Sequence, residues 1–514
     1  MSKTIIIIGA GLAGLSAALQ AAENGCNVKL VSSFPSERAQ SVMAEGGINA
    51  ALNTKDENDS PEEHFTDTIK AACGLADPNA VWGMTQAAPE LVHWLLKLGV
   101  QFNMSGYDDV DLRNFGGQKK KRTAFAQSDT GKQIMTAMID AVRRKEASGM
   151  VERFSHHSFL TLRLCDNICC GCVIRDEYSQ EIVELPGDAV IVASGGMHGL
   201  FGNTTGSLSN TGEVTAELFR LGVPLANGEM IQYHPTTVEC GGKRMLISEA
   251  ARGEGGRLFA MKDGKQWYFM EEKYPELGNL MPRDITAREI WKVSHESEVF
   301  LDMTEISDEI ISNKLSGLAD DCMTYLHKDI RKEPVSVLPG IHYFMGGILV
   351  DEQHRTSIQN LYAAGECCAQ YHGANRLGGN SLLGALYGGR VAAKSACEQA
   401  DVVELSCATQ IDVPPASQIS EIKQLNKVMQ ETMGVVRNEN TLLNGIRTVQ
   451  TLTGNLPLLG MAVLKSALAR KESRGAHWRE DYPKSNDDDY LKTTVARFDG
   501  KQIQISFVPV PERR

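Results

Sequence analysis

Five side chains that could bind or protonate an anion stand in segments marked by glycine or proline. They are His234, Arg252, Arg283, His342 and Arg376. Such segments usually place side chains at the rim of a site rather than on the surface of a helix. Taken singly, each arginine is typical of a solvated surface charge and each histidine of a structural residue. Together they indicate a small cationic pocket for an anionic ligand.

A glycine turn near the N-terminus predicts a dinucleotide as a second ligand. The segment Gly9-Ala-Gly-Leu-Ala-Gly14 follows four isoleucines and precedes a helical stretch. In such a turn the backbone approaches a pyrophosphate, whose charge the helix N-terminus favours. Ser32 and Ser33 stand where an NAD site usually has an acidic residue, which disfavours NAD. Two further strand-to-glycine segments, residues 192–196 and 361–366, favour the long cofactor FAD over a mononucleotide.

These residues require a parallel sheet flanked by helices. Residues 5–8 predict a strand buried on both faces, followed by a helix over 11–24 and a strand over 28–31. The same start also resembles a short signal peptide, but the isoleucine run that ends in glycines favours the strand. We further expect a site-lining loop over 103–122, helices over 129–145, 382–400 and within 425–469, strands over 159–164, 168–175, 182–185 and 189–193, and a hairpin within 495–508.

The composition divides the chain into three predicted domains. Residues 229–339 carry scattered charges and no nucleotide-type glycine turn, so we expect an inserted α+β capping domain there. Residues 1–228 and 340–404 form the predicted FAD-binding domain, which is discontinuous. A proline-containing linker over 406–418 leads to residues 419–514, a C-terminal helical domain and tail. The fold class is therefore α/β: a Rossmann-like FAD-binding domain, an inserted α+β capping domain and a C-terminal helical domain.

Charge and hydropathy exclude several classes of partner. The formal net charge is -12, which argues against nucleic-acid binding because that needs a basic face. No apolar run approaches the ~18–20 residues of a membrane span. We therefore expect a cytoplasmic protein that meets a membrane only through partner subunits.

The twelve cysteines indicate free thiols rather than a disulfide framework. They form neither a ferredoxin run nor a haem-attachment motif, so any iron–sulfur centre or haem must lie on another chain. The cluster Cys165, Cys169, Cys170 and Cys172 could bind a metal, but its strand pattern favours core packing, and we predict no metal site. Cys367-Cys368, next to the third glycine segment, could be redox-active, although packing behind the cofactor is favoured.

Seven segments in order give the chain a family resemblance. They are Ser41-Val-Met-Ala-Glu-Gly-Gly-Ile48, Gln232-Tyr-His-Pro-Thr236, Ser248-Glu-Ala-Ala-Arg-Gly-Glu-Gly-Gly256, Arg283-Asp284, His342-Tyr-Phe-Met-Gly-Gly347, His372-Gly-Ala-Asn-Arg-Leu-Gly-Gly-Asn-Ser-Leu-Leu383 and Glu472-Ser-Arg-Gly-Ala-His-Trp-Arg-Glu-Asp-Tyr482. Together they closely resemble the flavoprotein subunit of succinate dehydrogenase and fumarate reductase. L-aspartate oxidase is a close relative. The resemblance covers nearly the whole chain.

The resemblance and the glycine segments together imply an FAD site. The expected cofactor residues are Gly9, Ala10, Gly11, Leu12, Ala13, Gly14, Ser32, Ser33, Ser41, Glu45, Gly46, Gly47, Ala193, Ser194, Gly195, Glu213, Gly365, Glu366, Asn380, Ser381 and Leu382. The helix that starts at Asn380 could stabilise negative charge on a reduced flavin ring. Gln40 stands where membrane-bound relatives carry the histidine that bonds to FAD, so non-covalent FAD is expected. Glu213 departs from the family's usual TGDG segment.

The resemblance also assigns the pocket to a C4 dicarboxylate. His234, Ser248, His342 and Arg376 are expected to bind its carboxylates, with Phe115 and Gly379 completing the substrate-binding set. Arg283 is the expected proton donor in the reductive direction, and Glu249 and Arg252 relay protons to it. Because an arginine has a pKa above 12, this role requires a strongly basic carbon as acceptor and a rapid return of the proton.

The leading interpretation is an FAD-dependent fumarate reductase flavoprotein. Hydride would pass from N5 of reduced FAD to fumarate, and Arg283 would protonate the product to give succinate. L-aspartate oxidase and succinate dehydrogenase are alternatives, but Phe115 stands where the oxidases carry a glutamate for the substrate ammonium. A flavin-binding assembly or electron-transfer subunit without its own substrate is disfavoured by the complete set of carboxylate-binding segments. Related subunits use an iron–sulfur partner, and we expect one here.

Overall fold

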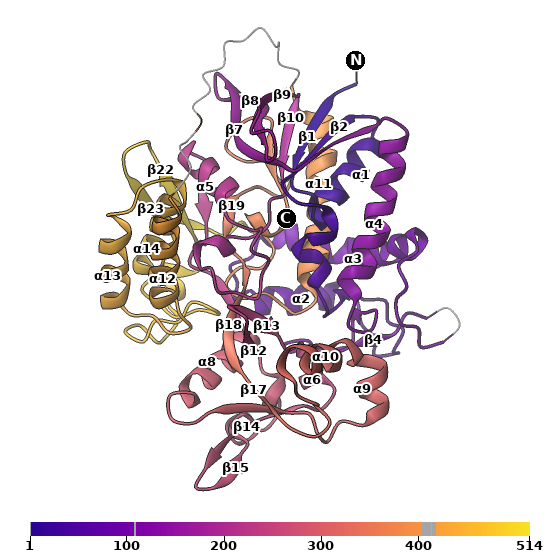
Figure 1. Cartoon of the computed structure of the whole chain (residues 1–514), viewed down its shortest axis with the longest axis vertical. Helices are drawn as coiled ribbons and strands as arrows, with labels where there is room; N and C mark the ends of the chain where they lie inside the picture. The colour runs from indigo at the N-terminus through magenta and orange to yellow at the C-terminus, as the bar shows by residue number, and fades with distance from the viewer. Residues whose placement is uncertain (1, 107–108, 402–412, 414–417) are drawn as a thin grey trace.

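The computed structural model describes residues 2–106, 109–401, 413 and 418–514, and Figure 1 shows the course of the chain. Almost all of the predicted linker over 406–418 lies outside the described residues. A parallel sheet flanked by helices, together with several antiparallel sheets, confirms the predicted α/β fold class. The predicted boundaries at 228, 339 and 404 remain predictions.

A five-stranded parallel sheet carries the glycine segments. Its order is β20-β10-β1-β2-β6, so strands that are distant in sequence lie side by side. The isoleucines of β1 are buried on both faces, as expected for a central parallel strand. The strand bounds are β1 Thr4–Ile8, β2 Asn27–Ser32, β6 Val151–Ser155, β10 Ala189–Val192 and β20 Leu361–Ala363.

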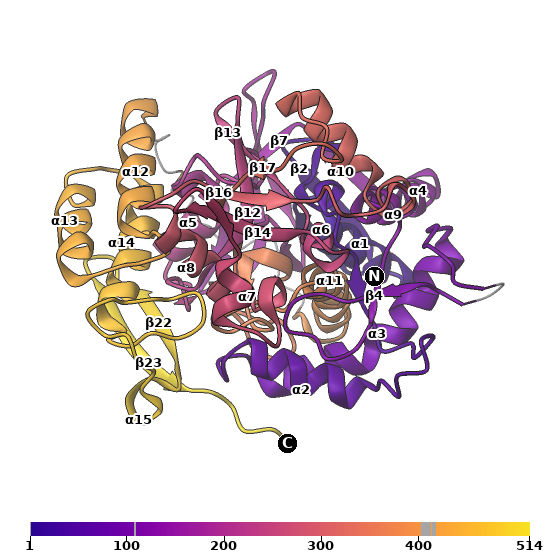
Figure 2. The same cartoon turned by 90° about the horizontal axis from the view of Figure 1, so that it is seen from below.

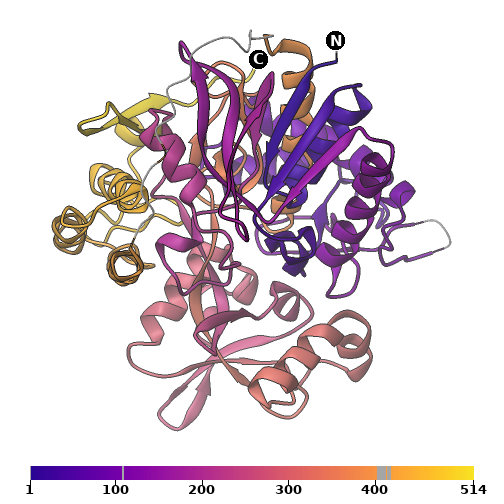
Figure 3. The same ribbon diagram turned by 45° about the horizontal axis from the view of Figure 1, so that its top comes forward.

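Helices cover one face of this sheet and a second sheet covers the other. The helices α1 (Leu12–Glu23), α3 (Pro78–Leu98), α4 (Thr130–Ala147) and α11 (Asn380–Gln399) share one hydrophobic cluster with β1 and β2. The antiparallel strands β7 (His157–Cys165), β8 (Ile168–Asp176) and β9 (Ile182–Pro186) contribute to a cluster on the opposite face. Figure 3 shows these layers above the segment predicted to form the cap. The predicted helices and strands are confirmed, with ends that differ by a few residues.

The segment predicted as the cap has its own hydrophobic cluster and two antiparallel sheets. One sheet contains β12 (Ile231–Cys240), β13 (Lys243–Leu246) and β18 (Leu338–Phe344). The other contains β14 (Arg257–Lys262), β15 (Lys265–Trp267), β16 (Val299–Asp302) and β17 (Val335–Ser336). Its helices are α6 Glu249–Gly253, α7 Phe269–Lys273, α8 Arg283–Val293, α9 Asp308–Lys314 and α10 Ser316–Asp321.

The described part of the C-terminal segment contains three long helices, the short helix α15 (Asp487–Tyr490) and a hairpin. The helices α12 (Ile419–Thr432), α13 (Glu439–Val449) and α14 (Asn455–Ala469) lie beside α5 (Glu213–Arg220), on the side away from α3 and α4 (Figure 2). The hairpin of β22 (Lys492–Phe498) and β23 (Ile503–Pro509) pairs with β11 (Leu225–Ala226). The predicted hairpin therefore extends a sheet of the FAD-binding part. The remaining elements include α2 Pro61–Ala71, β3 Ile48–Asn49, β4 Leu112–Arg113, β5 Thr123–Ala124, β19 Gly347–Leu349 and β21 Cys368–Ala369.

The described cysteines follow the prediction of free thiols with one exception. Ten cysteines of the described residues are free thiols, and burial raises the pKa of Cys169 to about 12. Cys165 is disulfide-bonded, so the prediction of free thiols is wrong for that residue. Among the described residues, no group of three or more His, Cys, Asp or Glu side chains could hold a metal ion. Within the same residues, no helix combines the length and apolar character that crossing a membrane requires.

Candidate active site

A cavity of about 580 Å³ lies where the carboxyl ends of the parallel strands meet the segment predicted as the cap. Ligands of parallel α/β sheets bind at this edge because the strand ends and helix N-termini converge there. Most predicted cofactor residues line the cavity, namely Gly9, Ala10, Gly11, Leu12, Ala13, Ser32, Ser33, Ser41, Glu45, Gly46, Gly47, Ala193, Ser194, Gly195, Glu213, Gly365, Glu366, Ser381 and Leu382. So do the predicted substrate and catalytic residues Phe115, His234, Ser248, Glu249, Arg283, His342, Arg376 and Gly379.

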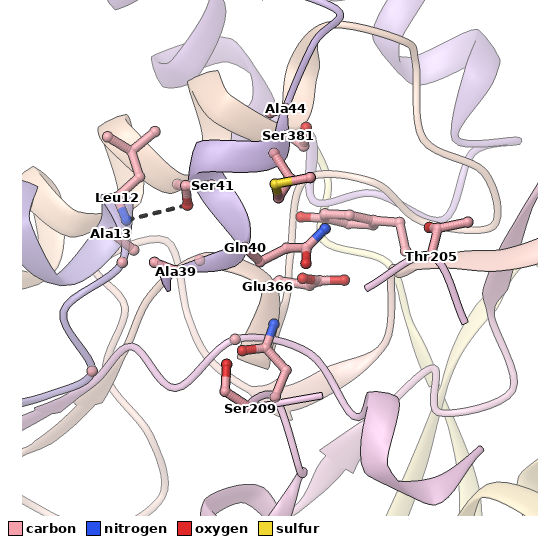
Figure 4. Close-up of a pocket in the computed structure, with 18 of the residues that line it drawn as sticks. Leu12, Ala13, Ala39, Gln40, Ser41, Ala44, Thr205, Ser209, Glu366 and Ser381 are labelled. Atoms are coloured by element: carbon pink, nitrogen blue, oxygen red, sulfur yellow. Dashed lines mark hydrogen bonds between the residues drawn. The ribbon is translucent and has the colours of Figure 1, made fainter. Parts of the chain in front are cut away.

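The turn after β1 fits a pyrophosphate. Gly9 has φ +111°, and a Cβ there would lie 2.2 Å from the carbonyl oxygen of Ala193. The helix α1 follows with Gly11 as its N-cap, which offers no side chain to the first turn. The Leu12 N–H donates to Ser41 Oγ at 3.3 Å (Figure 4). The turn therefore leaves the N-terminal end of α1 facing the cavity for an anion.

The end of β2 fits a ribose. Ser32 is buried, and its Oγ has no hydrogen-bond partner among the described residues. Ser33 Oγ, in contrast, lies 3.1 Å from Ser158 Oγ. A buried hydroxyl without a partner is costly, so a hydroxyl-bearing ligand at Ser32 would relieve that cost.

The start of α11 faces the other end of the cavity. Its N-cap is Gly379, with φ +84°, and a Cβ there would lie 2.1 Å from Asn49 Oδ1. Glycine is therefore required for both the conformation and the close approach. Ser381 and Leu382 line the cavity beside it. The positive end of the α11 dipole is available to a ligand that carries negative charge.

Three predicted site residues do not line the cavity. Gly14 packs α1 against the turn, because a Cβ there would lie 1.8 Å from Gly9 O. The Asn380 side chain accepts from Asn49 Nδ2 at 2.7 Å, behind the start of α11. Arg252 is buried behind Glu249, with its Nη2 3.7 Å from Glu249 Oε1. Gly14 and Asn380 therefore shape the site without side-chain contact, and any role of Arg252 must act through Glu249.

Gln40 occupies the cavity near the predicted flavin ring. Its Oε1 accepts a hydrogen bond from the Ser207 N–H, and its side chain points into the same part of the cavity as Glu366 (Figure 4). The Glu366 carboxylate accepts from the Phe344 N–H at 3.1 Å. Gln40 carries no imidazole nitrogen, so this position offers no group for the histidine linkage of the resemblance.

Arg283 and Glu249 form a buried ion pair in the substrate region. Arg283 Nε donates to Glu249 Oε2 at 2.8 Å, and Nη2 lies 2.6 Å from the same oxygen. The other carboxylate oxygen accepts from the Gly116 N–H at 3.1 Å. Burial alone would raise the pKa of Glu249, but Arg283 and Arg252 outweigh it and lower that pKa. Glu249 is therefore an ionised acceptor beside the guanidinium.

His234, His342 and Arg376 line the same cavity as Arg283. Among the described residues, His234 Nε2 and Arg376 Nε are buried without hydrogen-bond partners. The two imidazole rings lie 5.2 Å apart, and Thr205 Oγ1 is 2.8 Å from His342 Nδ1. Burial and then neighbouring positive groups lower the pKa of both histidines well below the usual range, so both are neutral at pH 7. Burial lowers the pKa of Arg376 to about 9. An anion here would satisfy the free nitrogens and stabilise Arg376.

An uncharged wall completes this end of the cavity. Phe115 is buried, and a Cβ on Gly46 would lie 3.1 Å from its ring. Burial and then Asp321 raise the pKa of Glu45 to about 8, against the opposing effects of Ser248 and Arg113. Glu45 is therefore mostly protonated at pH 7. The wall suits the apolar centre of a small dicarboxylate rather than an ammonium group.

Sequence reasoning missed several residues that line the cavity. They include Thr205, Ser209, Arg244, Asp321 and Tyr343. Arg244 Nε donates to Thr237 Oγ1 at 2.7 Å, and the Arg376 guanidinium lies 4.5 Å from the centre of the Tyr343 ring. The Ser/Thr-rich segment 204–211 and the arginine after the 232–236 motif were signals that could have been used.

Fold and cavity define an FAD-binding oxidoreductase. Residues 4–382 match the model of an FAD binding domain, and residues 452–513 match the fumarate reductase flavoprotein C-terminal model. The glycine turns, the Ser32 hydroxyl, which has no partner among the described residues, and the N-terminal ends of α1 and α11 at the cavity fit FAD.

Relatives of known name define the family more closely. The chain is 38% identical to the succinate dehydrogenase flavoprotein subunit of Bacillus subtilis, covering 100% of this chain and 98% of that protein. It is 32% identical to the 8-methylmenaquinol:fumarate reductase flavoprotein subunit of Wolinella succinogenes, covering 100% of this chain and 92% of that protein. E. coli quinol fumarate reductase FrdA matches with a TM-score of 0.90 at 27% identity, over 99% of this chain and 97% of that one. The chain belongs to the family of succinate dehydrogenase and fumarate reductase flavoprotein subunits, which are oxidoreductases acting on CH–CH groups.

Proposed function

We propose that this chain reduces fumarate to succinate with FAD held non-covalently. The observation that carries the choice of direction is Gln40, which lines the cavity where the family resemblance expects the covalently bonding histidine. In the family, covalent attachment raises the flavin potential and supports succinate oxidation. Glu45, a residue type found in some fumarate reductases where dehydrogenases often carry glutamine, supports the same choice.

Each end of the cofactor has a proposed set of contacts. The α1 N-terminus and Gly9–Ala13 hold the pyrophosphate, and Ser32 meets the ribose. The α11 N-terminus, with Ser381, lies against the flavin ring. FAD supplies the hydride when it is bound and reduced. The protein positions the substrate against it and excludes water, which accounts for much of the catalytic effect.

Substrate binding follows from the donors without partners. His234 and Arg376 each direct a free nitrogen to a carboxylate, and Ser248 and His342 complete the contacts. A neutral histidine has one N–H to donate. His342 Nε2 donates when its Nδ1 accepts from Thr205 Oγ1, and His234 Nε2 donates in the tautomer whose Nδ1 accepts from the Thr236 N–H, so both add hydrogen bonds without repelling Arg283. Phe115 packs against the CH=CH centre and Gly379 admits the substrate beside α11.

Arg283 is the proposed proton donor. It would protonate the carbon that becomes basic when the other alkene carbon accepts hydride. Glu249 accepts from two of its nitrogens, Nε and Nη2, and is placed to return the proton. Arg252, 3.7 Å from Glu249, continues the relay away from the cavity. Because Glu249 is ionised, it must first receive a proton from Arg252 and then pass it to Arg283. This relay would recharge the donor and so addresses the weakness of arginine as an acid.

The electron donor is proposed to be an iron–sulfur subunit. The twelve cysteines provide no ferredoxin or haem motif, so an iron–sulfur centre that supplies electrons would lie on another chain. We also propose a cytoplasmic location, with membrane contact only through partner subunits. Co-purification followed by iron and labile-sulfide analysis tests the proposed iron–sulfur subunit. A stable complex without iron would contradict that proposal.

Succinate oxidation is the second candidate. It is favoured by the 38% identity to the flavoprotein named succinate dehydrogenase in B. subtilis. L-aspartate oxidation is disfavoured, because Phe115 cannot accept a hydrogen bond from ammonium.

Steady-state assays in both directions test the proposal. Purified holoenzyme is given reduced viologen and fumarate, and separately succinate and an artificial oxidant. We expect faster turnover with fumarate. Faster turnover with succinate would assign the chain to the dehydrogenases, and turnover with neither would reject both functions.

A further inference from the structure

Three polar side chains outside the cavity join the segments that carry the proposed substrate contacts. Gln232 lies two residues before His234, Asp284 directly follows Arg283, and Asn375 directly precedes Arg376. None of the three lines the cavity. They come from β12, the first turn of α8 and the loop before α11, which lie far apart in the sequence.

Gln232 connects both arginines. Its Oε1 accepts from Arg283 Nη1 at 3.1 Å. Its Nε2 donates to the backbone carbonyl of Arg376 and to Asn375 Oδ1, each at 2.9 Å. Gln232 is fully buried, so water does not replace these bonds. One amide therefore fixes the guanidinium of Arg283 relative to the backbone of Arg376.

Asn375 extends this series of hydrogen bonds to the carboxylate of Asp284. Its Nδ2 donates to Asp284 Oδ1 at 3.1 Å, and the residue is 3% exposed. Burial raises the pKa of Asp284, and Arg288 opposes that shift. Asp284 lies next to Arg283 at the start of α8, so the series of hydrogen bonds begins and ends on the same helix.

The bonds have only one possible direction. An arginine only donates, so Arg283 turns the Gln232 oxygen toward itself. The Gln232 nitrogen then faces the Asn375 oxygen. The Asn375 nitrogen is therefore left to donate to Asp284 Oδ1. All four polar atoms of the two amides have partners, and Gln232 and Asn375 are buried, which makes this part of the network rigid.

We propose that Asn375 and Gln232 are positioning residues that set the placement of Arg283 relative to Arg376. The two guanidiniums must face one small dianion, and repulsion between them opposes their approach. Asn375 belongs to the predicted FAD-binding range, whereas Gln232 and Asp284 belong to the predicted cap. The network thus joins the two parts beside the substrate. The inference rests on the proposed dicarboxylate site but not on the direction of the reaction.

A charge swap tests the network. Asn375→Asp sets a carboxylate against Asp284, whereas Asp284→Asn lets the new amide turn its oxygen toward Asn375. The double variant restores one donor and one acceptor at the contact. We expect Asn375→Asp to lower kcat/KM for fumarate about 100-fold, a loss typical of small misplacements at a reacting centre. Asp284→Asn should stay within about threefold of the parent, and the double variant should recover at least about tenfold over Asn375→Asp.

Two further readouts separate positioning from folding. Succinate or malonate binding to the oxidised holoenzyme is followed by the change in the flavin spectrum, which needs no turnover. Asn375→Asp should weaken this binding while FAD content and thermal unfolding stay near the parent values. Unchanged dicarboxylate affinity, or absence of recovery in the double variant, would overturn the inference.

Separate outcomes identify a failure of the proposed function. If the parent binds these dicarboxylates but does not reduce fumarate, the direction is wrong and the network can still be tested. If the parent binds neither, both proposals are rejected. If the Asn375→Asp variant does not retain FAD, Gln232→Glu serves as the test variant instead. This substitution keeps an acceptor for Arg283 but removes the donor to Asn375 and Arg376, so it should also weaken binding, and parent-like affinity would refute the network.

Discussion

Replacing Arg283 with alanine tests the proposed proton donor and its carboxylate partner together. The substitution removes the guanidinium whose Nε and Nη2 lie 2.8 and 2.6 Å from Glu249 Oε2. Loss of one donor that acts in a transition state costs about 2.7–4 kcal/mol. Loss of general acid catalysis typically lowers the rate by a further factor of about 10²–10⁴. We therefore expect kcat for fumarate to fall by at least about 10⁴, with FAD still bound.

The same substitution leaves Glu249 buried beside only Arg252 and the Gly116 N–H. Breaking a buried ion pair by removing one partner costs about 3–5 kcal/mol of unfolding free energy. Burial then dominates the Glu249 carboxyl and raises its pKa. A carboxyl with a raised pKa is stable when protonated, so the stability of this variant should fall as the pH rises through that pKa.

Paired variants separate the chemical loss from the structural loss. In Arg283→Ala with Glu249→Gln the unpaired charge is gone, so stability should return while activity stays lost. Arg283→Lys keeps the charge but not the paired nitrogens, and should remain folded with low activity. The assays are urea unfolding, FAD content and fumarate turnover by reduced viologen. Near-parent turnover by a folded Arg283→Ala holoenzyme would refute the assignment of the proton donor.

Three further predictions concern cofactor, titration and stability. Because Gln40 offers no imidazole, acid precipitation should release all flavin into the supernatant; flavin retained in the pellet would contradict this. Because the pKa of Glu45 is about 8 in the folded protein, its protonated form stabilises the fold. This contribution to the unfolding free energy is fully present below the pKa of Glu45 in the unfolded chain and is lost as the pH rises through 8. Glu45→Gln should therefore flatten the decline of the unfolding midpoint with pH, and an unchanged slope would refute that pKa. Arg470→Met should cost about 3–5 kcal/mol in urea unfolding, because it leaves the buried Glu229 carboxylate without Arg470, whereas Glu472 keeps its ion pair with Arg474; Glu229→Gln should recover part of the cost, and a cost under about 1 kcal/mol would contradict the pairing.

The cofactor cradle could be predicted because its signals are local. Gly9, Gly11 and the isoleucines before them specify a turn between a buried strand and a helix, and each requirement acts over a few residues. The same locality explains two differences. Gly14 belongs to the motif but serves packing, and Asn380 begins the correct helix but turns its side chain away from the cavity.

The network behind the substrate region could not be predicted in the same way. Gln232 and Asn375 stand within recognisable motifs, but their spacing does not reveal that they bond to each other across 143 positions. Arg244 lines the cavity only because the hairpin of β12 and β13 turns it inward beside Thr237. Such contacts depend on how separate segments pack, which residue types alone do not determine.

Anaerobic single-turnover mixing tests the central claim most directly. Reduced holoenzyme is mixed with fumarate, and oxidised holoenzyme with succinate or L-aspartate, while the absorption band of oxidised flavin is recorded. Because the proposed substrate site offers cations for two carboxylates and Phe115 for the centre, we predict rapid recovery of the band by fumarate, slower bleaching by succinate and none by L-aspartate. Rapid bleaching by L-aspartate with slow reoxidation by fumarate would contradict the account.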